Sequence, residues 1–534
     1  MAPQLAVSVL DYLSPAAKAA SLPLLFPLLL ILLLLPYLAS ASRSSSKKLP
    51  PSPPGALPLI GHAHLVAALP HSSFRRLATQ HPGCGDFMTI RLGAVPTMVA
   101  SSSRAAQALL RTHELAFSSR VHTACVDVLT YGPADVAFEP YGERWRQSRK
   151  LVATHLLSAT KVRAYRAARL EEIELVVGQV RSAAAAGVGV DVSELTRKYT
   201  NDMVCQAVAG RAIRVEGRDR VFRDLINQTL AILSGFNLEN FYPGIARVAG
   251  SVLMWPLRRK TLRLRDRWDD FLDRFIDLRM SEVGNNGVVA SADQDQDQDD
   301  RDLLHVLLSV QQEYGLTRDR IKGLMANMVA AATDSTFGVL EMAMAELMLH
   351  PDVMAKLQAE VRKSVPHGQN FVTEDDLVGM PYLKAVVKET LRIHPPTPLL
   401  PRVSHEDCVV DGYTIPAGMP VIVNAWALGR DPTLWDAAEE FIPERFIDTG
   451  DTTCPDFRGM NFQYLPFGSG RRMCPGIGFA TAHIEIMLAN LMFHFDWELP
   501  SSVDTIDMTE VFKLTVSLKE KLILNPKLRG DIIA

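Results

Sequence analysis

The spacing of apolar and polar residues predicts a body built mainly of helices with a few short strands. Five stretches repeat apolar residues every three or four positions, as the buried face of a helix requires. They are Val162–Ala185, Leu262–Val283, Leu303–Gln312, Ile321–Leu349 and Val353–Val365. Phe87–Leu92 and Thr97–Ala100 are short runs whose composition predicts strands. The pattern therefore favours a mainly α fold with small β-sheets.

The amino-terminal region departs from this pattern with a long apolar segment. Ala19–Ser40 is leucine-rich and uncharged, and its roughly 20 residues suffice to span a bilayer as a helix. One lysine precedes it and three basic residues follow before position 49, which predicts a lumenal segment over residues 1–18 and a cytosolic body. We expect one transmembrane anchor in the endoplasmic reticulum, bent by its prolines. A cleaved signal peptide is the alternative, because Ala39-Ser40-Ala41 suits cleavage.

Two further segments differ from the rest of the chain in composition. Residues 41–60 are first basic and then proline-rich (LPPSPPG), which favours a stiff hinge between the anchor and a body at 61–534. Residues 285–300 are polar and acidic and predict a surface loop. Chain length alone would suggest several domains, but the motifs described below run from Trp145 to Cys474 and must converge on one site. We therefore expect one large domain.

Composition excludes some classes of function. The hydrophobic share of 48% is ample for a large core, and the formal net charge of −3 gives no indication of nucleic-acid binding. The six cysteines form no C-x-x-C pair and no dense pattern of a disulfide-rich secreted protein. We expect a protein of a reducing compartment that has no nucleic-acid partner.

One cysteine lies in a segment with specific chemical potential. Phe467–Gly476 (FGSGRRMCPG) places Cys474 among glycines and arginines at the spacing F-x-x-G-x-R-x-C-x-G. A thiolate can ligate haem iron, and glycines let backbone amides approach the sulfur closely. The planar, permanently charged fork of Arg472 suits a haem propionate. A buried cysteine beside a basic turn is the alternative, but it would not fix so many positions. We predict a haem b site with Cys474 as the iron ligand.

At these residues the chain resembles the cytochrome P-450 family of haem-thiolate monooxygenases. Lys388–Arg392 (KETLR) matches the family's E-x-x-R helix, and Pro443–Phe446 (PERF) resembles the segment that supplies a third charged residue. The resemblance implies that Glu389, Arg392 and Arg445 form a buried structural charge network behind the haem. It also implies the α-rich P-450 fold for the body of the chain. Because Glu389 and Arg392 are three positions apart, they share one face of a helix.

Another match concerns the haem propionates. Trp145–Arg149 (WRQSR) is similar to the W-x-x-x-R of a helix that crosses one side of the haem in this family. A spacing of four places Trp145 and Arg149 on one stripe of a helix, and both side chains only donate hydrogen bonds. The resemblance implies that both residues, together with Arg402, contact a propionate. Each alone would more often be a packing tryptophan or a solvated arginine, so the inference depends on Cys474.

The predicted helix Ile321–Leu349 contains the segment AATDST, which resembles the family's A-G-x-D-T-T segment for oxygen chemistry. Proton delivery to dioxygen requires an acid linked to water and an alcohol. Asp334 and Ser335 are expected in these roles, with Thr336 as the alternative alcohol. Ala332 replaces the usual glycine and Ser335 the usual threonine, so the efficiency of oxygen coupling is left open. The hydroxyl groups could instead merely bond back to helix carbonyls.

The resemblance extends over nearly the whole chain and is strongest for plant microsomal members. The segments that look like grass enzymes of benzoxazinoid defence are FEPYGE at 138–143, AWALGRDP at 425–432 and NLMFHFDW at 490–497, with TRKYTND at 196–202 and QEYGLT at 312–317. The resemblance implies hydroxylation of a small hydrophobic aromatic metabolite such as indole, indolin-2-one, 3-hydroxyindolin-2-one or 2-hydroxy-1,4-benzoxazin-3-one. The pathway step stays open because these segments belong to the scaffold. Hydroxylation of other plant metabolites or xenobiotics is the alternative.

The family resemblance also implies an external source of electrons. Electrons from NADPH would arrive through NADPH-cytochrome reductase, an FAD/FMN flavoprotein, and O2 would be the co-substrate. No G-x-G-x-x-G turn occurs in a strand-to-helix setting, so we do not expect the chain to bind NADPH itself. Two other classes of function fit the sequence less well. Rearrangement of hydroperoxides is disfavoured by the retained Asp334 and Ser335, and a haem carrier without turnover is favoured only by Ala332.

Overall fold

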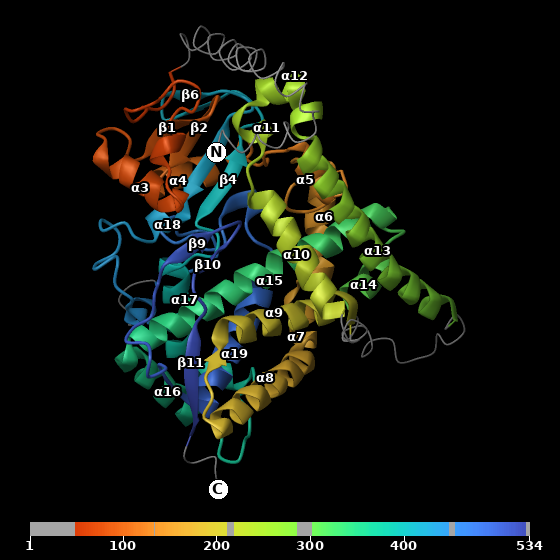
Figure 1. Ribbon diagram of the computed structural model, residues 1–534, viewed down its shortest axis with the longest axis vertical. Coiled ribbons are helices and arrows are strands. Elements are labelled where there is room, and N and C mark those ends of the chain that lie inside the picture. Colours follow the sequence, from red (N-terminus) through yellow and green to blue (C-terminus); the bar gives the residue numbers. More distant parts are fainter. Residues whose placement is uncertain (1–47, 133, 211–217, 286–301, 448–453, 530–534) are drawn as a thin grey trace, which may run out of the picture.

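The computed structural model describes residues 48–132, 134–210, 218–285, 302–447 and 454–529 (Figure 1). The expected lumenal segment, the anchor at 19–40, the basic start of the hinge and nearly all of the acidic segment 285–300 lie outside these residues. Within the described ranges, no helix is both long enough and apolar enough to cross a membrane.

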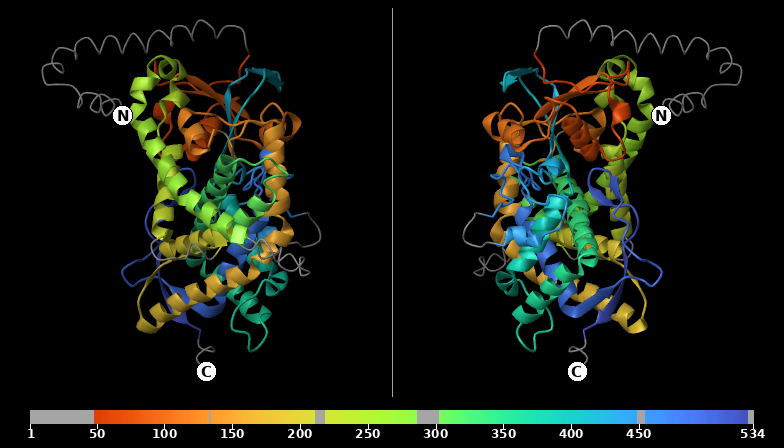
Figure 2. Two further views of the ribbon diagram at one scale, coloured as in Figure 1. Left: turned by 90° about the vertical axis from the view of Figure 1, so that its right-hand side faces the viewer. Right: turned by 90° about the vertical axis from the view of Figure 1, so that its left-hand side faces the viewer.

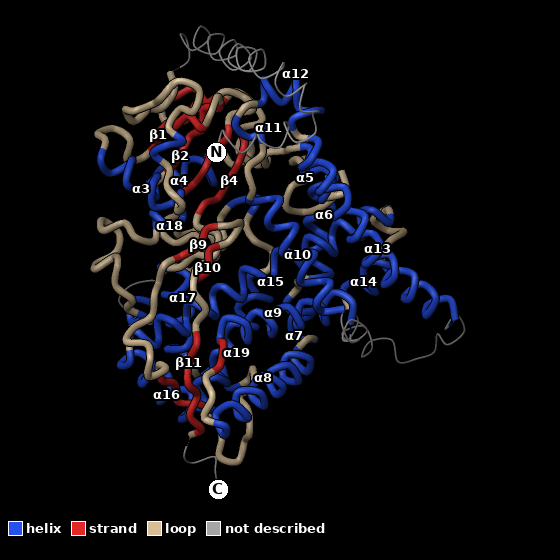
Figure 3. The backbone as a smooth tube through the Cα atoms, in the orientation of Figure 1, coloured by secondary structure: helices blue, strands red, loops and turns tan. Residues whose placement is uncertain are grey.

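Helices dominate the described chain (Figure 3). The longer ones are α3 (Pro70–Gln80), α6 (Glu143–Leu151), α8 (Arg166–Ala186), α9 (Val192–Ala209), α10 (Arg218–Ser234), α12 (Pro243–Leu253), α13 (Trp255–Asn285), α15 (Arg318–Leu349), α16 (Pro351–Ser364), α17 (Pro381–Ile393) and α19 (Ile477–His494). The shorter ones are α4 (Ser103–Gln107), α5 (Ala124–Leu129), α7 (Ala159–Ala164), α11 (Leu238–Phe241), α14 (Leu303–Ser309) and α18 (Ala425–Leu428).

The strands form small sheets that pack against the helices. The largest sheet has the order β1-β2-β7-β4, in which β2 and β7 run parallel and the other neighbours run antiparallel. Its strands are β1 (Phe87–Leu92), β2 (Val95–Ala100), β4 (Leu399–Val403) and β7 (Pro420–Asn424). A three-stranded sheet has the order β3-β11-β8 and consists of β3 (Val190–Asp191), β11 (Ile523–Leu528) and β8 (Phe495–Glu498). Two hairpins complete the set: β5 (Cys408–Val410) with β6 (Tyr413–Ile415), and β9 (Glu510–Phe512) with β10 (Val516–Leu518).

Most of the predicted elements are confirmed, although α13 begins at Trp255, seven residues before the expected helix 262–283. Two other predicted helices differ more. The expected helix 162–185 is interrupted at Tyr165, which separates α7 from α8. The Tyr165 ring is buried and its hydroxyl donates to the carbonyl of Ala207 at 3.3 Å, so a distant contact accompanies the break. The expected helix 303–312 ends at Ser309, and the chain then turns to Gly315, whose φ of +58° favours glycine. Periodicity alone did not contain either signal.

The long helix α15 crosses the middle of the molecule (Figure 1). The hydroxyl of Thr317 caps its first turn by accepting from the N–H of Arg320. Its carboxyl-terminal half is buried on nearly all sides and packs against α9, α17 and α19. Because α19 begins directly after the cysteine loop, the packing of α15 and α19 connects the helix that contains the AATDST segment with Cys474.

The sheet of β1 and β2 and the helices α11 and α12 share one end of the molecule (Figures 1 and 2). The N–H of Ala94, in the turn between β1 and β2, donates to the carbonyl of Phe241 at the end of α11, at 2.8 Å. Figure 2 shows that the start of the described chain lies at this end as well. The carbonyl of Lys48 accepts from the N–H of Thr414 in β6 at 2.8 Å, so the start of the described chain is held against this small sheet.

Candidate haem site

A tight loop presents Cys474 just before the amino terminus of α19. Gly468 and Gly470 have φ values of +72° and +68°, and a Cβ atom added at Gly470 would lie 2.3 Å from the carbonyl oxygen of Leu110. The N–H of Cys474 donates to the carbonyl of Phe467 at 2.9 Å. The N–H of Gly476 points at the Cys474 Sγ atom, at 3.3 Å. This amide and the positive end of the α19 dipole both favour negative charge on the sulfur.

Cys474 lies deep among protein atoms, yet its side chain keeps an accessible surface. Burial raises the pKa of its thiol, while the N–H of Gly476 and the charge of Arg149 act in the opposite direction. The protein groups alone therefore leave the thiol a weak acid. A metal ion that binds the sulfur removes this barrier, because a coordinated thiol loses its proton.

Buried arginines converge beside this cysteine. The Nη1 atoms of Arg120 and Arg402 both donate to the carbonyl of Pro401, at 2.8 and 2.9 Å. Burial lowers the pKa of Arg402 well below its usual value, and the charges of Arg120 and Arg472 lower it further. Burial also lowers the pKa of Arg120 to about 10, and its Nε atom has no hydrogen-bond partner among the described residues. Clustered buried cations with unused donors require an anion, and the two propionates of haem fit this need.

Arg472 and Trp145 lie together, but both donate to the main chain in this structure. Arg472 donates from Nε to the carbonyl of Ser118 at 2.6 Å and from Nη1 to the carbonyl of Val136 at 3.1 Å. The Trp145 Nε1 atom donates to the same Val136 carbonyl at 3.0 Å. The guanidinium of Arg472 lies 4.3 Å from the centre of the indole. These bonds fasten the chain before α6 to the cysteine loop.

Arg149 is the third predicted residue of this group, and its charge is close enough to act on the Cys474 thiol. Burial lowers the pKa of Arg149, whereas the negative charge that Cys474 carries when ionised raises it. Arg149 therefore faces the same region as the cysteine. The structure brings Arg149, Arg402, Arg472 and Cys474 to one site, as the sequence motifs suggested. The Trp145 ring packs against the guanidinium of Arg472.

Two charged residues of this site were missed by the sequence analysis, namely Arg120 and Asp135. The Asp135 carboxylate accepts from the N–H groups of Phe138 and Glu139, at 2.7 and 3.3 Å, and from Asn327 Nδ2 on α15 at 3.2 Å. Burial raises the pKa of Asp135 to about 7, against the effect of those amides. Neither residue belongs to a motif that the sequence made recognisable.

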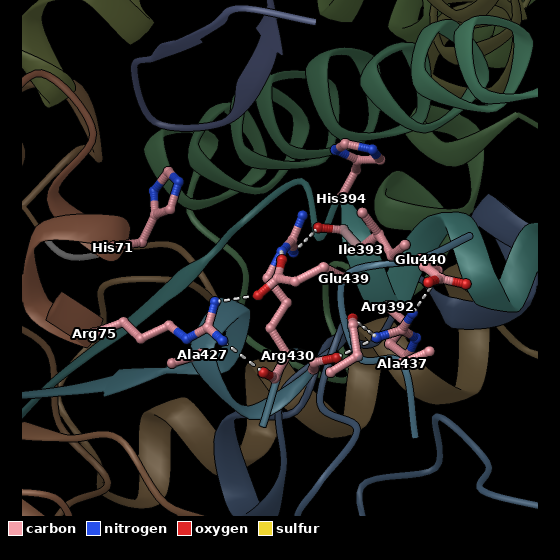
Figure 4. Close-up of polar contacts among 12 residues, drawn as sticks. His71, Arg75, Arg392, Ile393, His394, Ala427, Arg430, Ala437, Glu439 and Glu440 are labelled. Carbon is pink, nitrogen blue, oxygen red and sulfur yellow. Dashed lines mark hydrogen bonds and ion pairs between the residues drawn. The ribbon is translucent and has the colours of Figure 1, made fainter. Parts of the chain in front are cut away.

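Glu389, Arg392 and Arg445 meet in one network. Arg392 donates to Glu389 through Nε and Nη2, both at 2.7 Å, and Arg445 Nε donates to Glu389 Oε1 at 3.3 Å. Arg392 also donates to three main-chain carbonyls, those of Gly429, Ala438 and Glu440; Figure 4 shows the bond to Glu440. Glu389 and Arg392 are fully buried. The network therefore fixes the chain between 429 and 445 against α17.

This network is joined to the cysteine loop by one hydrogen bond. The hydroxyl of Tyr464, which precedes the loop, donates to the carbonyl of Lys388 in α17 at 2.8 Å. The Tyr464 ring is buried and packs against Phe446 at a centroid distance of 5.1 Å. Displacement of the buried charges would therefore be transmitted to the loop that carries Cys474.

The α15 segment places an acid in contact with a partly exposed arginine and with the hydroxyl of the β9–β10 turn. The Oδ1 atom of Asp334 pairs with Arg197 at 3.6 Å, and its Oδ2 atom accepts from the hydroxyl of Thr515 at 3.0 Å. Arg197 is 33% exposed, so it connects the acid with bulk water. The hydroxyl of Ser335 donates to the carbonyl of Ala331 at 2.7 Å and keeps its acceptor lone pairs. Thr336 is buried.

The α-rich fold, the accessible cysteine at the head of α19 and the buried arginines define a haem-thiolate protein. The chain belongs to the cytochrome P450 family, which matches residues 50–525, and it is a haem monooxygenase. The fold is that of solved P450 structures. A zebra fish cytochrome P450 determined with abiraterone has a TM-score of 0.70 and 23% identity, and the match covers 87% of this chain and all of the other.

Three curated relatives from Zea mays extend the similarity to nearly the full length. Indole-2-monooxygenase is 47% identical over 99% of this chain and 100% of its own length. The 3-hydroxyindolin-2-one monooxygenase is 46% identical over 92% of both chains. Indolin-2-one monooxygenase is also 46% identical, over 90% of this chain and 89% of its own.

Proposed function

We propose that this monooxygenase hydroxylates a small indole-derived metabolite of benzoxazinoid biosynthesis. The observation that carries the proposal is the near full-length identity of 47% to an indole-2-monooxygenase. Relatives named for 3-hydroxyindolin-2-one and indolin-2-one stand at 46%. These identities differ by one percentage point, so they support the substrate class but do not distinguish among the individual substrates. A binding experiment can make that distinction.

Each chemical task of the proposed reaction has a candidate residue in this chain. Cys474 would hold the haem iron, and Trp145, Arg149, Arg402 and Arg472 would contact the propionates. Arg120, which shares the Pro401 carbonyl with Arg402, would join them. The haem, when bound, supplies the activation of dioxygen. Asp334 would pass protons from the solvent side, where Arg197 contacts its carboxylate. The hydroxyl of Ser335, or that of Thr336, would receive the proton and hold water near the reacting oxygen.

Electrons would come from NADPH through a separate FAD/FMN-containing reductase. The sequence supports this division, because it contains no phosphate-binding glycine turn in a strand-to-helix setting. The requirement for both NADPH and reductase separates this function from hydroperoxide rearrangement, which needs neither. It also separates it from a haem carrier, which would form no product.

The enzyme would be held on the cytosolic face of the endoplasmic reticulum by its segment 19–40. Exposed apolar side chains on α12 and at the start of α13 support a membrane-facing end. Val248 is 72% exposed, Val252 68% and Trp255 49%, and basic residues Arg258 and Arg259 follow. Apolar groups flanked by cations are suited to a bilayer with anionic headgroups. This end also carries the start of the described chain (Figure 2).

The test combines haem ligation with substrate choice in one preparation. A carbon-monoxide difference spectrum of the reduced protein should show the thiolate-type Soret band, and Cys474→Ser should lose it. Titration with indole, indolin-2-one, 3-hydroxyindolin-2-one and a hydroxybenzoxazinone should give a high-spin shift with one of them. That ligand should then be hydroxylated only with NADPH, reductase and O2. A thiolate band without any ligand-induced shift would contradict the indole-derived substrate class.

A further inference from the structure

The β9–β10 hairpin binds α15 through two carboxylates of that helix. Asp334 Oδ2 accepts from the hydroxyl of Thr515 at 3.0 Å, and Glu341 Oε2 accepts from the N–H of Leu518 at 3.0 Å. Asp334 and Glu341 are seven positions apart and therefore lie on one face of the helix. The hairpin is far from Asp334 in sequence, so only the fold creates this contact.

The main chain around Thr515 is held on both sides. The N–H of Lys513 donates to the carbonyl of Thr515 at 2.9 Å, which closes the turn. The next residue, Val516, donates its N–H to the carbonyl of Pro396 at 3.0 Å and pairs with Phe512 across the hairpin. The β-branched side chain of threonine also restricts its own rotamers. The hydroxyl is therefore presented to Asp334 from a fixed position.

The two partners of Asp334 differ in what they can do when the carboxylate gains a proton. Arg197 only donates, so its contact at 3.6 Å favours the ionised form alone. The Thr515 hydroxyl can donate to an ionised Oδ2 and accept from a protonated one, because it carries one donor and two lone pairs. A hydroxyl at this position keeps its bond to Asp334 in both states, whereas a methyl group cannot.

We propose that Thr515 is a positioning residue for proton delivery by Asp334. The proposal rests on the role proposed above for Asp334. Thr515 holds the carboxyl in one orientation while a proton enters from the side of Arg197 and leaves toward Ser335. The coupled reaction is substrate C–H + O2 + NADPH + H⁺ → C–OH + H2O + NADP⁺. When the proton arrives late or misplaced, the competing reaction is O2 + NADPH + H⁺ → H2O2 + NADP⁺.

The experiment compares Thr515→Val with Thr515→Ser in the reductase-reconstituted enzyme. Product and hydrogen peroxide are measured per NADPH consumed, with the indole-derived compound that gives the high-spin shift. We expect Thr515→Val to lower product per peroxide about tenfold or more, the effect of one hydrogen bond to a charged group. Thr515→Ser should stay within about twofold of the unaltered enzyme, because it keeps the hydroxyl. The matched control is Thr509→Val. The Thr509 hydroxyl, in the segment just before β9, donates to the exposed carboxylate of Asp507.

Two further measurements distinguish positioning from a structural defect. The reduced carbon-monoxide spectrum and the substrate-induced spin shift of Thr515→Val should match those of the unaltered protein. The double variant Thr515→Val/Asp334→Asn should be no worse coupled than Asp334→Asn alone, since both act on one step. If Thr515→Val incorporates too little haem, Thr515→Ala replaces it in the same comparison.

Each outcome bears on a different claim. Uncoupling by Asp334→Asn together with full coupling in Thr515→Val would overturn the role of Thr515 and leave that of Asp334 intact. Full coupling in Asp334→Asn would overturn the role of Asp334 and with it the basis of this proposal. Additive losses in the double variant would assign Thr515 to the scaffold instead.

Discussion

Glu389 and Arg392 form a bidentate ion pair that is completely buried, with both N–O distances at 2.7 Å. Because three carbonyls and Arg445 take up the remaining hydrogen-bonding capacity, neither charge is left without a partner. A charge network satisfied in this way contributes to specificity, while loss of one member exposes the full cost of burying the other.

Glu389→Gln should therefore destabilise the protein severely. The substitution leaves the Arg392 guanidinium buried without a counter-charge, at a cost of roughly 3 to 5 kcal/mol. Urea unfolding of the haem-loaded protein, followed by the Soret band, measures this change. The matched control is Glu439→Gln. The Glu439 carboxylate pairs with Arg75 and Arg430 but is 60% exposed (Figure 4), so we expect little change in the free energy of unfolding. Equal effects of the two substitutions would contradict the network.

Arg120→Met should accelerate haem loss. Arg120 has an unpartnered buried Nε atom beside Arg402, and we infer that a propionate supplies its partner. Loss of one charge-assisted bond, worth about 1.4 kcal/mol, corresponds to a tenfold faster release. Transfer of haem to excess apomyoglobin measures the rate. Arg458→Met, at an 83% exposed site, is the control, and an unchanged rate in Arg120→Met would separate Arg120 from the propionates.

Gly470→Ala should disrupt the cysteine loop. A methyl group there would meet the Leu110 carbonyl at 2.3 Å, and the φ of +68° is unfavourable for alanine. We expect a lower yield of the thiolate-type carbon-monoxide band and a lower melting temperature. Gly178→Ala should have the opposite effect on stability. Gly178 is exposed in α8, and no atom lies within 4 Å of a methyl group added there. Its better helix propensity should stabilise by up to about 1 kcal/mol.

The pair of His394 and Glu510 should give stability a pH dependence. The His394 Nδ1 atom lies 3.1 Å from Glu510 Oε1, and its Nε2 atom lies 2.7 Å from Glu346 Oε1. Burial opposes both charges, but the hydrogen bonds prevail: the pKa of Glu510 falls to about 2 and the pKa of His394 rises. The Glu510 contribution is complete above about pH 4.5, its ordinary pKa, and is lost toward pH 2.

The sign is reversed for His394, whose contribution is complete below its ordinary pKa of 6.5 and is lost as the pH rises through its raised folded pKa. The free energy of unfolding should thus be larger at pH 5.5 than at pH 8.5. Urea unfolding at both pH values measures the difference, and Glu510→Gln should reduce it. A difference that survives in Glu510→Gln/Glu346→Gln would assign the pH dependence to other groups.

Local features of the chain were predictable because they depend on neighbours in sequence. The strands β1 and β2 are separated by a short turn, and their apolar residues identified them. Glu389 and Arg392 share a helical face by spacing alone. The cysteine loop could be recognised because glycines and a cysteine at fixed spacing leave few other interpretations. The break at Tyr165 accompanies a contact with distant Ala207, and periodicity alone predicted neither this break nor the end of α14 at Ser309.

The sequence by itself determined the chemical groups: one cysteine in a glycine-rich loop, an acid and alcohols in a long apolar helix, and a helical glutamate–arginine pair. Only the tertiary structure decided which distant groups serve them. Arg120 joins Arg402 at the carbonyl of Pro401, Asp135 reaches Asn327 across 192 positions, and Thr515 reaches Asp334 across 181. Such contacts follow from how complete helices and sheets pack around a shared core, and periodicity within a short window carries no information about that packing.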